Sequence, residues 1–164
     1  MGSGTWKDIF CNQTWQDIMI KIGIDPDLDK SGFALTYQQT KEVTTYTISE
    51  LIGRIVQLVE EFPGIPVHVY IEFGELNKSN FHIGRIPPGV RDIKAYCAQI
   101  GANTGKNFAT SKLILDLISA MGIKCTKVRP TNRKIDAATF KKLSGINKRT
   151  NQEMRDAFML IIGR

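Results

Sequence analysis

The fold is decided by the stretch Met19-Ile-Lys-Ile-Gly-Ile-Asp-Pro-Asp-Leu-Asp-Lys-Ser-Gly-Phe-Ala-Leu-Thr36. From residue 18 to residue 24, isoleucine stands at every second position, which is the pattern of a β-strand. The strand is expected to end at Asp25-Pro26, because proline has no amide hydrogen to donate to a neighbouring strand. A second strand begins at Gly32, so the stretch predicts a hairpin with an acidic turn.

Asp25 stands at the end of the first of these strands. A carboxylate is costly to bury unless a cation lies beside it, which makes Asp25 the first candidate for a metal ligand. The alternative is a solvated aspartate that caps the turn. The stretch by itself favours neither.

The rest of the chain alternates between strand and helix patterns. Strands are predicted at 42–48, 66–73 and 123–128, and helices at 49–61, 91–105, 107–121, 136–143 and from 151 onward. The strand at 66–73 is apolar at nearly every position, as expected for a central strand covered on both faces. His68 within it is expected to be a packed histidine. The order predicts an α/β fold of the ribonuclease H type, with a mixed five-stranded sheet and helices on both faces.

The 164 residues suit one domain, which we expect to span 19–164. Residues 1–18 are expected to be an extension, because the first four residues resemble an expression remnant. Residues 74–89 form a connection long enough to suggest a functional loop. No apolar run reaches the length of a membrane span and no signal peptide is evident, so a cytoplasmic protein is expected. The three cysteines lack metal-binding spacing and are expected to be reduced.

Charge divides the chain into two halves. Residues 1–84 carry 6 Lys and Arg against 11 Asp and Glu, whereas residues 85–164 carry 16 against 5. The second half is therefore strongly basic, which favours a polyanionic partner. The alternative is a solvated basic surface without a ligand.

Three further carboxylates stand at informative positions. Glu72 ends the apolar strand at 66–73, and Glu153 and Asp156 lie three residues apart on the last helix, so they share a face. A helix packed across the central strands would bring these groups to Asp25. Carboxylates that close repel one another unless divalent cations bridge them, and oxygen ligands suit Mg²⁺ or Mn²⁺. Two such ions suit phosphodiester cleavage. The alternative for Glu153 is an ordinary solvated helix residue.

These residues carry a family resemblance. Gly23-Ile-Asp-Pro26 with Ser31-Gly32, Tyr70-Ile-Glu72, and Arg155-Asp-Ala157 resemble the three signature blocks of the RuvC family of Holliday-junction resolvases. Ile100-Gly-Ala-Asn-Thr-Gly-Lys-Asn107, ahead of a helix, is similar to the phage-encoded branch of that family. The resemblance implies a homodimeric, metal-dependent endodeoxyribonuclease that nicks two opposed strands of a four-way junction, in a bacterial or phage-infected cell.

The resemblance also assigns residues to the metal site. Asp25, Glu72 and Asp156 match the family's metal ligands, with two ions per site. Glu153 stands where the family more often has aspartate or histidine, and Asp27 where glycine is commoner. Two alternatives remain: a catalytically inactive junction-binding protein on the same fold, and a nuclease for other branched DNA. An actin-like fold would need more chain and further glycine-rich phosphate loops.

DNA contacts are expected in a turn at 103–106, where Gly105 would admit a phosphate to a helix N-terminus, and among basic residues around the acidic helix. The candidates are Asn103, Gly105, Lys106, Lys134, Lys141, Lys142, Lys148 and Arg149. The alternative for Gly105 is a packing or capping role. The helix at 107–121 is expected to form the dimer interface, because its apolar residues cover more than one core-facing stripe. The alternative is a helix buried within the monomer.

Overall fold

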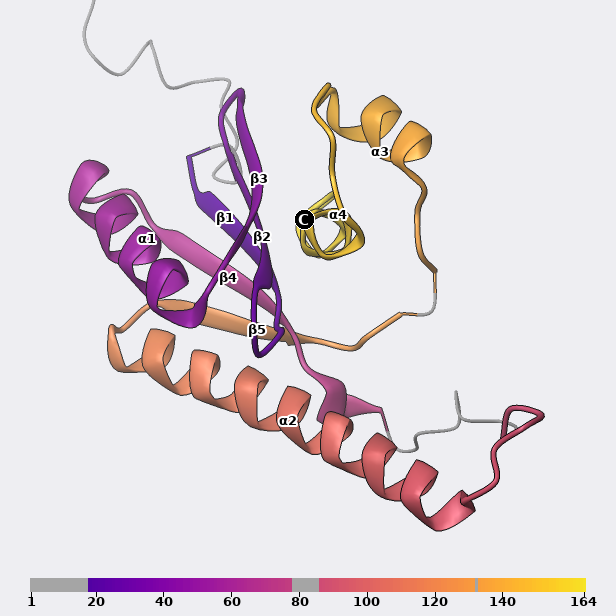
Figure 1. Ribbon diagram of the computed structural model, residues 1–164. Helices are drawn as coiled ribbons and strands as arrows, with labels where there is room; N and C mark the ends of the chain where they lie inside the picture. The colour runs from indigo at the N-terminus through magenta and orange to yellow at the C-terminus, as the bar shows by residue number, and fades with distance from the viewer. Residues whose placement is uncertain (1–17, 78–85, 132) are drawn as a thin grey trace, which may run out of the picture.

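The computed structural model describes residues 18–77, 86–131 and 133–164 (Figure 1). Within these ranges, five strands form one sheet in the order β3-β2-β1-β4-β5. The strands are β1 (Ile20–Asp25), β2 (Ser31–Tyr37), β3 (Thr40–Tyr46), β4 (Val67–Glu72) and β5 (Lys124–Val128). β1, β2 and β3 form an antiparallel meander, whereas β4 pairs parallel with both β1 and β5. The predicted mixed five-stranded sheet is confirmed.

The predicted hairpin turn is organised by Asp27. Its Oδ1 accepts hydrogen bonds from the backbone amides of Asp29 and Lys30, at 2.9 and 3.3 Å. The Ser31 hydroxyl closes the turn, because it accepts from the amide of Asp27 and donates to the Asp27 carbonyl. The aspartate at this position therefore has a structural role in the turn that follows β1.

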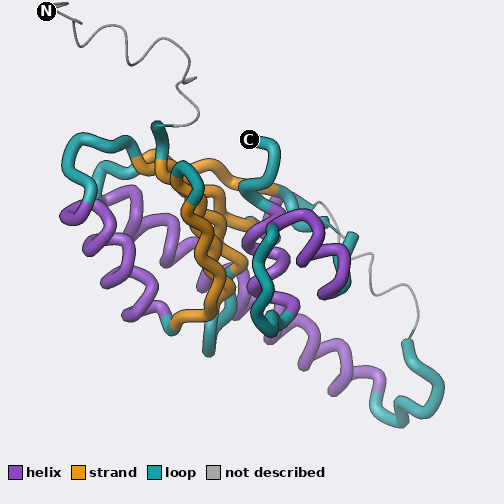
Figure 2. The backbone as a smooth tube through the Cα atoms, turned by 90° about the horizontal axis from the view of Figure 1, so that it is seen from above, coloured by secondary structure: helices purple, strands orange, loops and turns teal. Residues whose placement is uncertain are grey.

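Helices cover both faces of the sheet, as predicted, and Figure 2 shows the strands between the two helical layers. On one face, α1 (Ile48–Glu61) and α2 (Ile93–Ala120) bury a core against the alternating isoleucines of β1. On the other face, α3 (Ala137–Ser144) and α4 (Gln152–Met159) contribute to a second core. The period of two along β1 assigns its even-numbered residues to the first face and its odd-numbered residues to the second.

The prediction of two helices at 91–105 and 107–121 is wrong, because α2 is one continuous helix of 28 residues. It begins after Asp92, whose side chain accepts from the amide of Ala95, and it ends before Gly122, which has a φ of +73°. Gly105 lies inside this helix, where glycine costs about 1 kcal/mol relative to alanine but does not end a helix. The predicted turn at 103–106, with its helix N-terminus, is therefore absent.

The other helix boundaries lie close to the predicted ones. α1 begins at Ile48, one residue before the predicted start at 49, because Thr47 caps it in a reciprocal capping box with Glu50. Asp136 and Asn151 cap α3 and α4, which begin one residue after the predicted starts at 136 and 151. A short 3₁₀ helix, η2 (Gly74–Leu76), follows β4.

Several predictions concern residues beyond this description. Most of the predicted extension at 1–18 and half of the predicted functional loop, at 78–85, lie outside the described residues. Among the residues described, Cys97 and Cys125 are free thiols. None of the helices in the described ranges has the length and apolarity to cross a membrane.

Candidate active site

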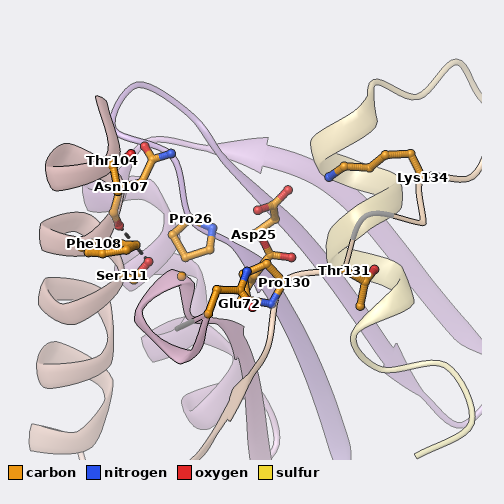
Figure 3. Close-up of a pocket in the computed structure, with 12 residues that line it drawn as sticks. Asp25, Pro26, Glu72, Thr104, Asn107, Phe108, Ser111, Pro130, Thr131 and Lys134 are labelled. Carbon is orange, nitrogen blue, oxygen red and sulfur yellow. Dashed lines mark hydrogen bonds between the residues drawn. The ribbon is translucent and has the colours of Figure 1, made fainter. Parts of the chain in front are cut away.

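Asp25 and Glu72 end two neighbouring parallel strands at the same edge of the sheet. Ile24 of β1 pairs with Ile71 of β4, so the next residue of each strand is one of the two carboxylates. Both line a cavity of about 320 Å³, and Figure 3 shows them between α2 and Lys134. The predicted neighbourhood of these carboxylates therefore follows from the strand register.

Two glycines let α4 lie directly on the strands. A Cβ atom at Gly23 would lie 2.0 Å from the backbone oxygen of Ala157, and one at Gly32 would lie 2.2 Å from the backbone oxygen of Glu153. Only glycine permits so close an approach of two backbones. Because Asp25 follows Gly23 by two residues, it points to the same face of the sheet, toward α4.

Asp156 faces the strand ends from α4 and is 9% exposed. Its Oδ1 accepts a hydrogen bond of 2.8 Å from the Gln152 side chain, and its Oδ2 forms an ion pair with the ammonium of Lys134. Arg155 anchors the helix, because it donates to the carbonyls of Ile135 at 3.0 Å and Thr150 at 2.8 Å. The predicted helix across the central strands thus brings Asp156 to the other two carboxylates.

Burial and the charges within the cluster shift the pKa values of Asp25, Glu72 and Lys134. Burial, followed by the charges of Glu72 and Asp156, raises the pKa of Asp25 from 3.8 to about 8. Burial also raises the pKa of Glu72; the charge of Asp156 adds to this rise and that of Lys134 opposes it. Burial lowers the pKa of Lys134, but the hydrogen bond and the charges of the carboxylates outweigh burial and raise it overall. The cluster therefore holds more negative charge than one ammonium neutralises.

Glu153 occupies the margin of this cluster. It lies half-buried in the first turn of α4, and its charge is the last of the contributions that raise the pKa of Asp25. Its backbone oxygen, rather than its carboxylate, makes the close approach to Gly32. The structure thus brings Asp25, Glu72 and Asp156 together and leaves Glu153 as the outermost of the four predicted residues.

The chemistry of the cluster fits a hard divalent cation. Carboxylate oxygens are the ligands that Mg²⁺ and Mn²⁺ take, and the pKa of Asp25 is raised by burial and then by the negative charges of Glu72 and Asp156, which a bound cation would offset. In the described part of the chain, however, no group of three or more His, Cys, Asp or Glu side chains is arranged to hold a metal ion as it stands. A cation already lies among the carboxylates, namely the Lys134 ammonium.

The second wall of the cavity is formed by α2, through residues that differ from the predicted ones. Thr104, Asn107, Phe108 and Ser111 line it, and the Ser111 hydroxyl donates to the Asn107 carbonyl at 2.8 Å (Figure 3). These four positions have the spacing of one helix face. Asn103, Gly105 and Lys106 are exposed on other sides of α2. The sequence signal for this wall was the helical spacing of three small polar residues, Thr104, Asn107 and Ser111.

The remaining predicted DNA-binding residues lie on the α3 and α4 side. Lys141 and Lys142 are exposed in the last turn of α3, and Lys148 and Arg149 are exposed in the loop before α4. Lys41 connects β3 to this region, because its ammonium donates to the Ser144 carbonyl at 2.7 Å. Lys134 differs from the others, since it lies in the carboxylate cluster.

Comparison with known proteins concerns the fold alone. Neither a protein-family model nor a curated protein matches the sequence. Thermus thermophilus RuvC in complex with a Holliday junction substrate is structurally similar, with a TM-score of 0.50 and 13% identity over 87% of this chain and 89% of that chain. A further Thermus thermophilus RuvC structure gives a TM-score of 0.45 and 12% identity over 87% of this chain and 90% of that one. The chain has a RuvC-type, ribonuclease H-like fold.

Proposed function

We propose that the protein is a metal-dependent, structure-selective endodeoxyribonuclease that resolves four-way DNA junctions by nicking two opposed strands. The convergence of Asp25, Glu72 and Asp156 from three separate elements is the observation that carries the proposal. The fold shared with a protein solved on a Holliday junction substrate supports branched DNA as the substrate class.

Asp25, Glu72 and Asp156 would hold two Mg²⁺ or Mn²⁺ ions, with Glu153 in a supporting position. When bound, such ions supply electrostatic stabilisation of phosphodiester hydrolysis. The chain itself positions these carboxylates at the ends of two strands and on α4. The helix cannot move away from the strands without breaking the close backbone contacts at Gly23 and Gly32. The cavity between α2 and the carboxylates would receive the strand to be cut.

A homodimer would match the two equivalent strands of a four-way junction. Leu113 and Leu117 on α2, with Met121 at its C-cap, form a row at four-residue spacing and are 48%, 38% and 36% exposed. Ile114 and Ile118 on the same helix are fully buried in the core. The row therefore lies outside the monomer core, which supports α2 as the interface.

A second candidate is a junction-binding protein without cleavage. One observation favours it: the ion pair of Lys134 with Asp156 gives the cluster a cation without any metal. All four candidate carboxylates are nevertheless present, which favours the nuclease.

Incubation of a four-way junction and of a linear duplex of the same sequence with the protein and Mg²⁺ tests the proposal. Tight binding and nicking of the junction, with little of either on the duplex, is the expected result. Binding without nicking in both Mg²⁺ and Mn²⁺ would select the second candidate. Equal cleavage of duplex and junction would contradict structure selectivity.

A further inference from the structure

Lys134 is placed among the carboxylates rather than on the basic surface. Its ammonium forms an ion pair with Asp156, whose side chain is 10% exposed, and it also feels the charges of Asp25 and Glu72. An ammonium that neutralises buried carboxylates occupies the position in which a divalent cation would do the same. The lysine and the metal would therefore compete for one site.

The arm of Lys134 also lies where two cavities meet. The larger cavity, of about 320 Å³, runs from the carboxylates to α2. A second, of about 90 Å³, lies toward the end of α4 and is lined by Leu160 and Arg164. Glu72, Thr131 and Lys134 line both cavities. Movement of the Lys134 arm would therefore join the two into one groove past the carboxylates.

The chain on either side permits this movement. Residues 133–135 lie in neither a helix nor a strand, and the Lys134 side chain is 53% exposed. The neighbouring backbone is fixed by the hydrogen bond from Arg155 to the Ile135 carbonyl. The flexible lysine arm can therefore leave the cluster while the fold around it stays in place.

We propose that Lys134 is an internal counter-ion that competes with divalent cations for the carboxylate cluster, so that metal binding requires displacement of its ammonium. This inference rests on the metal site of the proposed function. Displaced into the joined groove, the ammonium would find a new partner in a phosphate of the bound strand. Metal and DNA would then each favour binding of the other, because both favour the same displaced position of Lys134.

Titration of the DNA-free protein with Mn²⁺, followed by calorimetry or by the electron paramagnetic resonance of free Mn²⁺, tests the competition. Lys134→Met and Lys134→Gln should each bind Mn²⁺ about tenfold more tightly than the wild type, because an opposing charge is removed from the site. Lys124→Met is the matched control: it removes one lysine charge at the other end of β5, beside His68, and should leave the affinity within about twofold.

Unchanged or weaker Mn²⁺ binding by both Lys134 variants would overturn the competition while leaving the metal site intact. Absence of Mn²⁺ binding in the wild type and in every variant would overturn the metal site as well. Thermal melts provide a check on folding. The expected pattern is a lower melting temperature for metal-free Lys134→Met, because Asp156 loses its partner, and a larger rise on addition of Mn²⁺ than in the wild type.

Discussion

The fold buries the carboxyl group of Asp25 beside two other carboxylates. In the absence of metal, Asp25 therefore lowers the free energy of unfolding. Its pKa in the folded protein is about 8, against 3.8 as the ordinary value. Between these two pH values the folded chain binds a proton that the unfolded chain has released. The contribution of Asp25 to the free energy of unfolding is therefore most favourable below about pH 4, and it is lost as the pH rises toward 8. An acidic group with so strong a perturbation at a cavity is typical of a functional site.

Asp25→Asn should stabilise the metal-free protein, and the gain should grow as the pH rises from 5 to 8. The expected gain is on the order of 1–3 kcal/mol at the upper end, because the variant lacks the carboxyl group whose proton the unfolded chain releases and the folded chain retains in this pH range. Urea unfolding in the presence of a chelator, at several pH values, measures it. Parallel stability curves for variant and wild type across this range would show that Asp25 is not the group responsible.

His68 shows that a polar residue in a strand can be entirely structural. Its ring is buried, forms a 2.8 Å hydrogen bond with the Thr126 hydroxyl, and stacks on Tyr70 at 4.3 Å. Burial lowers its pKa, as do the charges of Lys124 and Arg164. The expectation of a packed histidine is confirmed, and no metal role is needed to account for it.

At the scale of elements, the site depends on how closely α4 approaches the sheet. Gly32 pairs with Asp25 across the hairpin, and the first turn of α4 lies directly over it. Gly23 in β1 and Gly32 in β2 have no side chains, and this leaves room for the helix that carries Asp156. The position of the helix that carries Asp156 is therefore set by close backbone contact as well as by the packing of apolar side chains in the second core.

Gly32→Ala should destabilise the protein by about 2 kcal/mol or more, because its Cβ would lie 2.2 Å from a backbone oxygen. It should also impair the site by moving α4 away from Asp25. Gly53→Ala, inside α1 with open space around it, is the matched control and should stabilise by about 0.5–1 kcal/mol. Chemical unfolding of the two variants measures the contrast. Equal effects of the two substitutions would contradict the close approach of α4.

The sequence was sufficient for the elements whose local signals are strong. The isoleucine alternation predicted β1, and the starts of α3 and α4 were predicted to within one residue, at 136 and 151. It was insufficient for α2, because Gly105 looks like an interruption while hydrogen bonding through the long helix outweighs the cost of this glycine. The same error hid the polar wall of the cavity, since a turn at 103–106 shifts which residues share a face.

The candidate site, too, could be predicted from the sequence only in part. Asp25 and Glu72 were identified by their positions at strand ends and Asp156 by the helix face that it shares with Glu153, and the family resemblance implied a common role for them. The position of Lys134 depends on where residues 129–131 and 133–135 lie at the end of the sheet, and no local pattern determines the path of such a connection. Contacts of this kind are tertiary, so the sequence predicted a basic residue near the helix but not a cation within the cluster.

At the scale of the whole molecule, exposed lysines and arginines surround the acidic residues at the strand ends. Lys141 and Lys142 lie on α3, on the side of the sheet that α4 covers, and both are exposed. A strand that enters the carboxylate cavity would have its flanking phosphates within reach of such a surface. Binding of this kind releases counter-ions from the DNA and so depends strongly on salt.

Charge reversal of Lys141 and Lys142 should weaken junction binding several-fold and reduce the dependence of affinity on salt. Lys124→Glu, at the opposite end of β5 from the site, is the control and should have the smaller effect on that dependence. Binding isotherms over a range of salt concentrations measure both. An unchanged salt dependence in the α3 variant would place the DNA surface elsewhere.

The exposed row on α2 predicts a dimer. Sedimentation at micromolar concentration should give about twice the 18.4 kDa monomer mass, and Leu117→Glu should halve it without unfolding the chain. Leu143→Glu, an exposed leucine on α3 at the other face of the sheet, should leave the mass unchanged. A wild type that stays monomeric both free and bound to a junction would contradict paired nicking and leave a single-site nuclease.

The central claim is that Asp25, Glu72 and Asp156 together make one metal-dependent cleavage site. The most direct measurement is the rate at which a labelled four-way junction is nicked in Mg²⁺ by the wild type and by Asp25→Asn, Glu72→Gln and Asp156→Asn, with junction affinity determined in parallel. Each substitution should lower the nicking rate by more than about a hundredfold and leave binding largely intact, whereas Glu153→Gln should cause a partial loss. Wild-type nicking by any one of the three would remove that residue from the site, and wild-type nicking by all three would contradict the account.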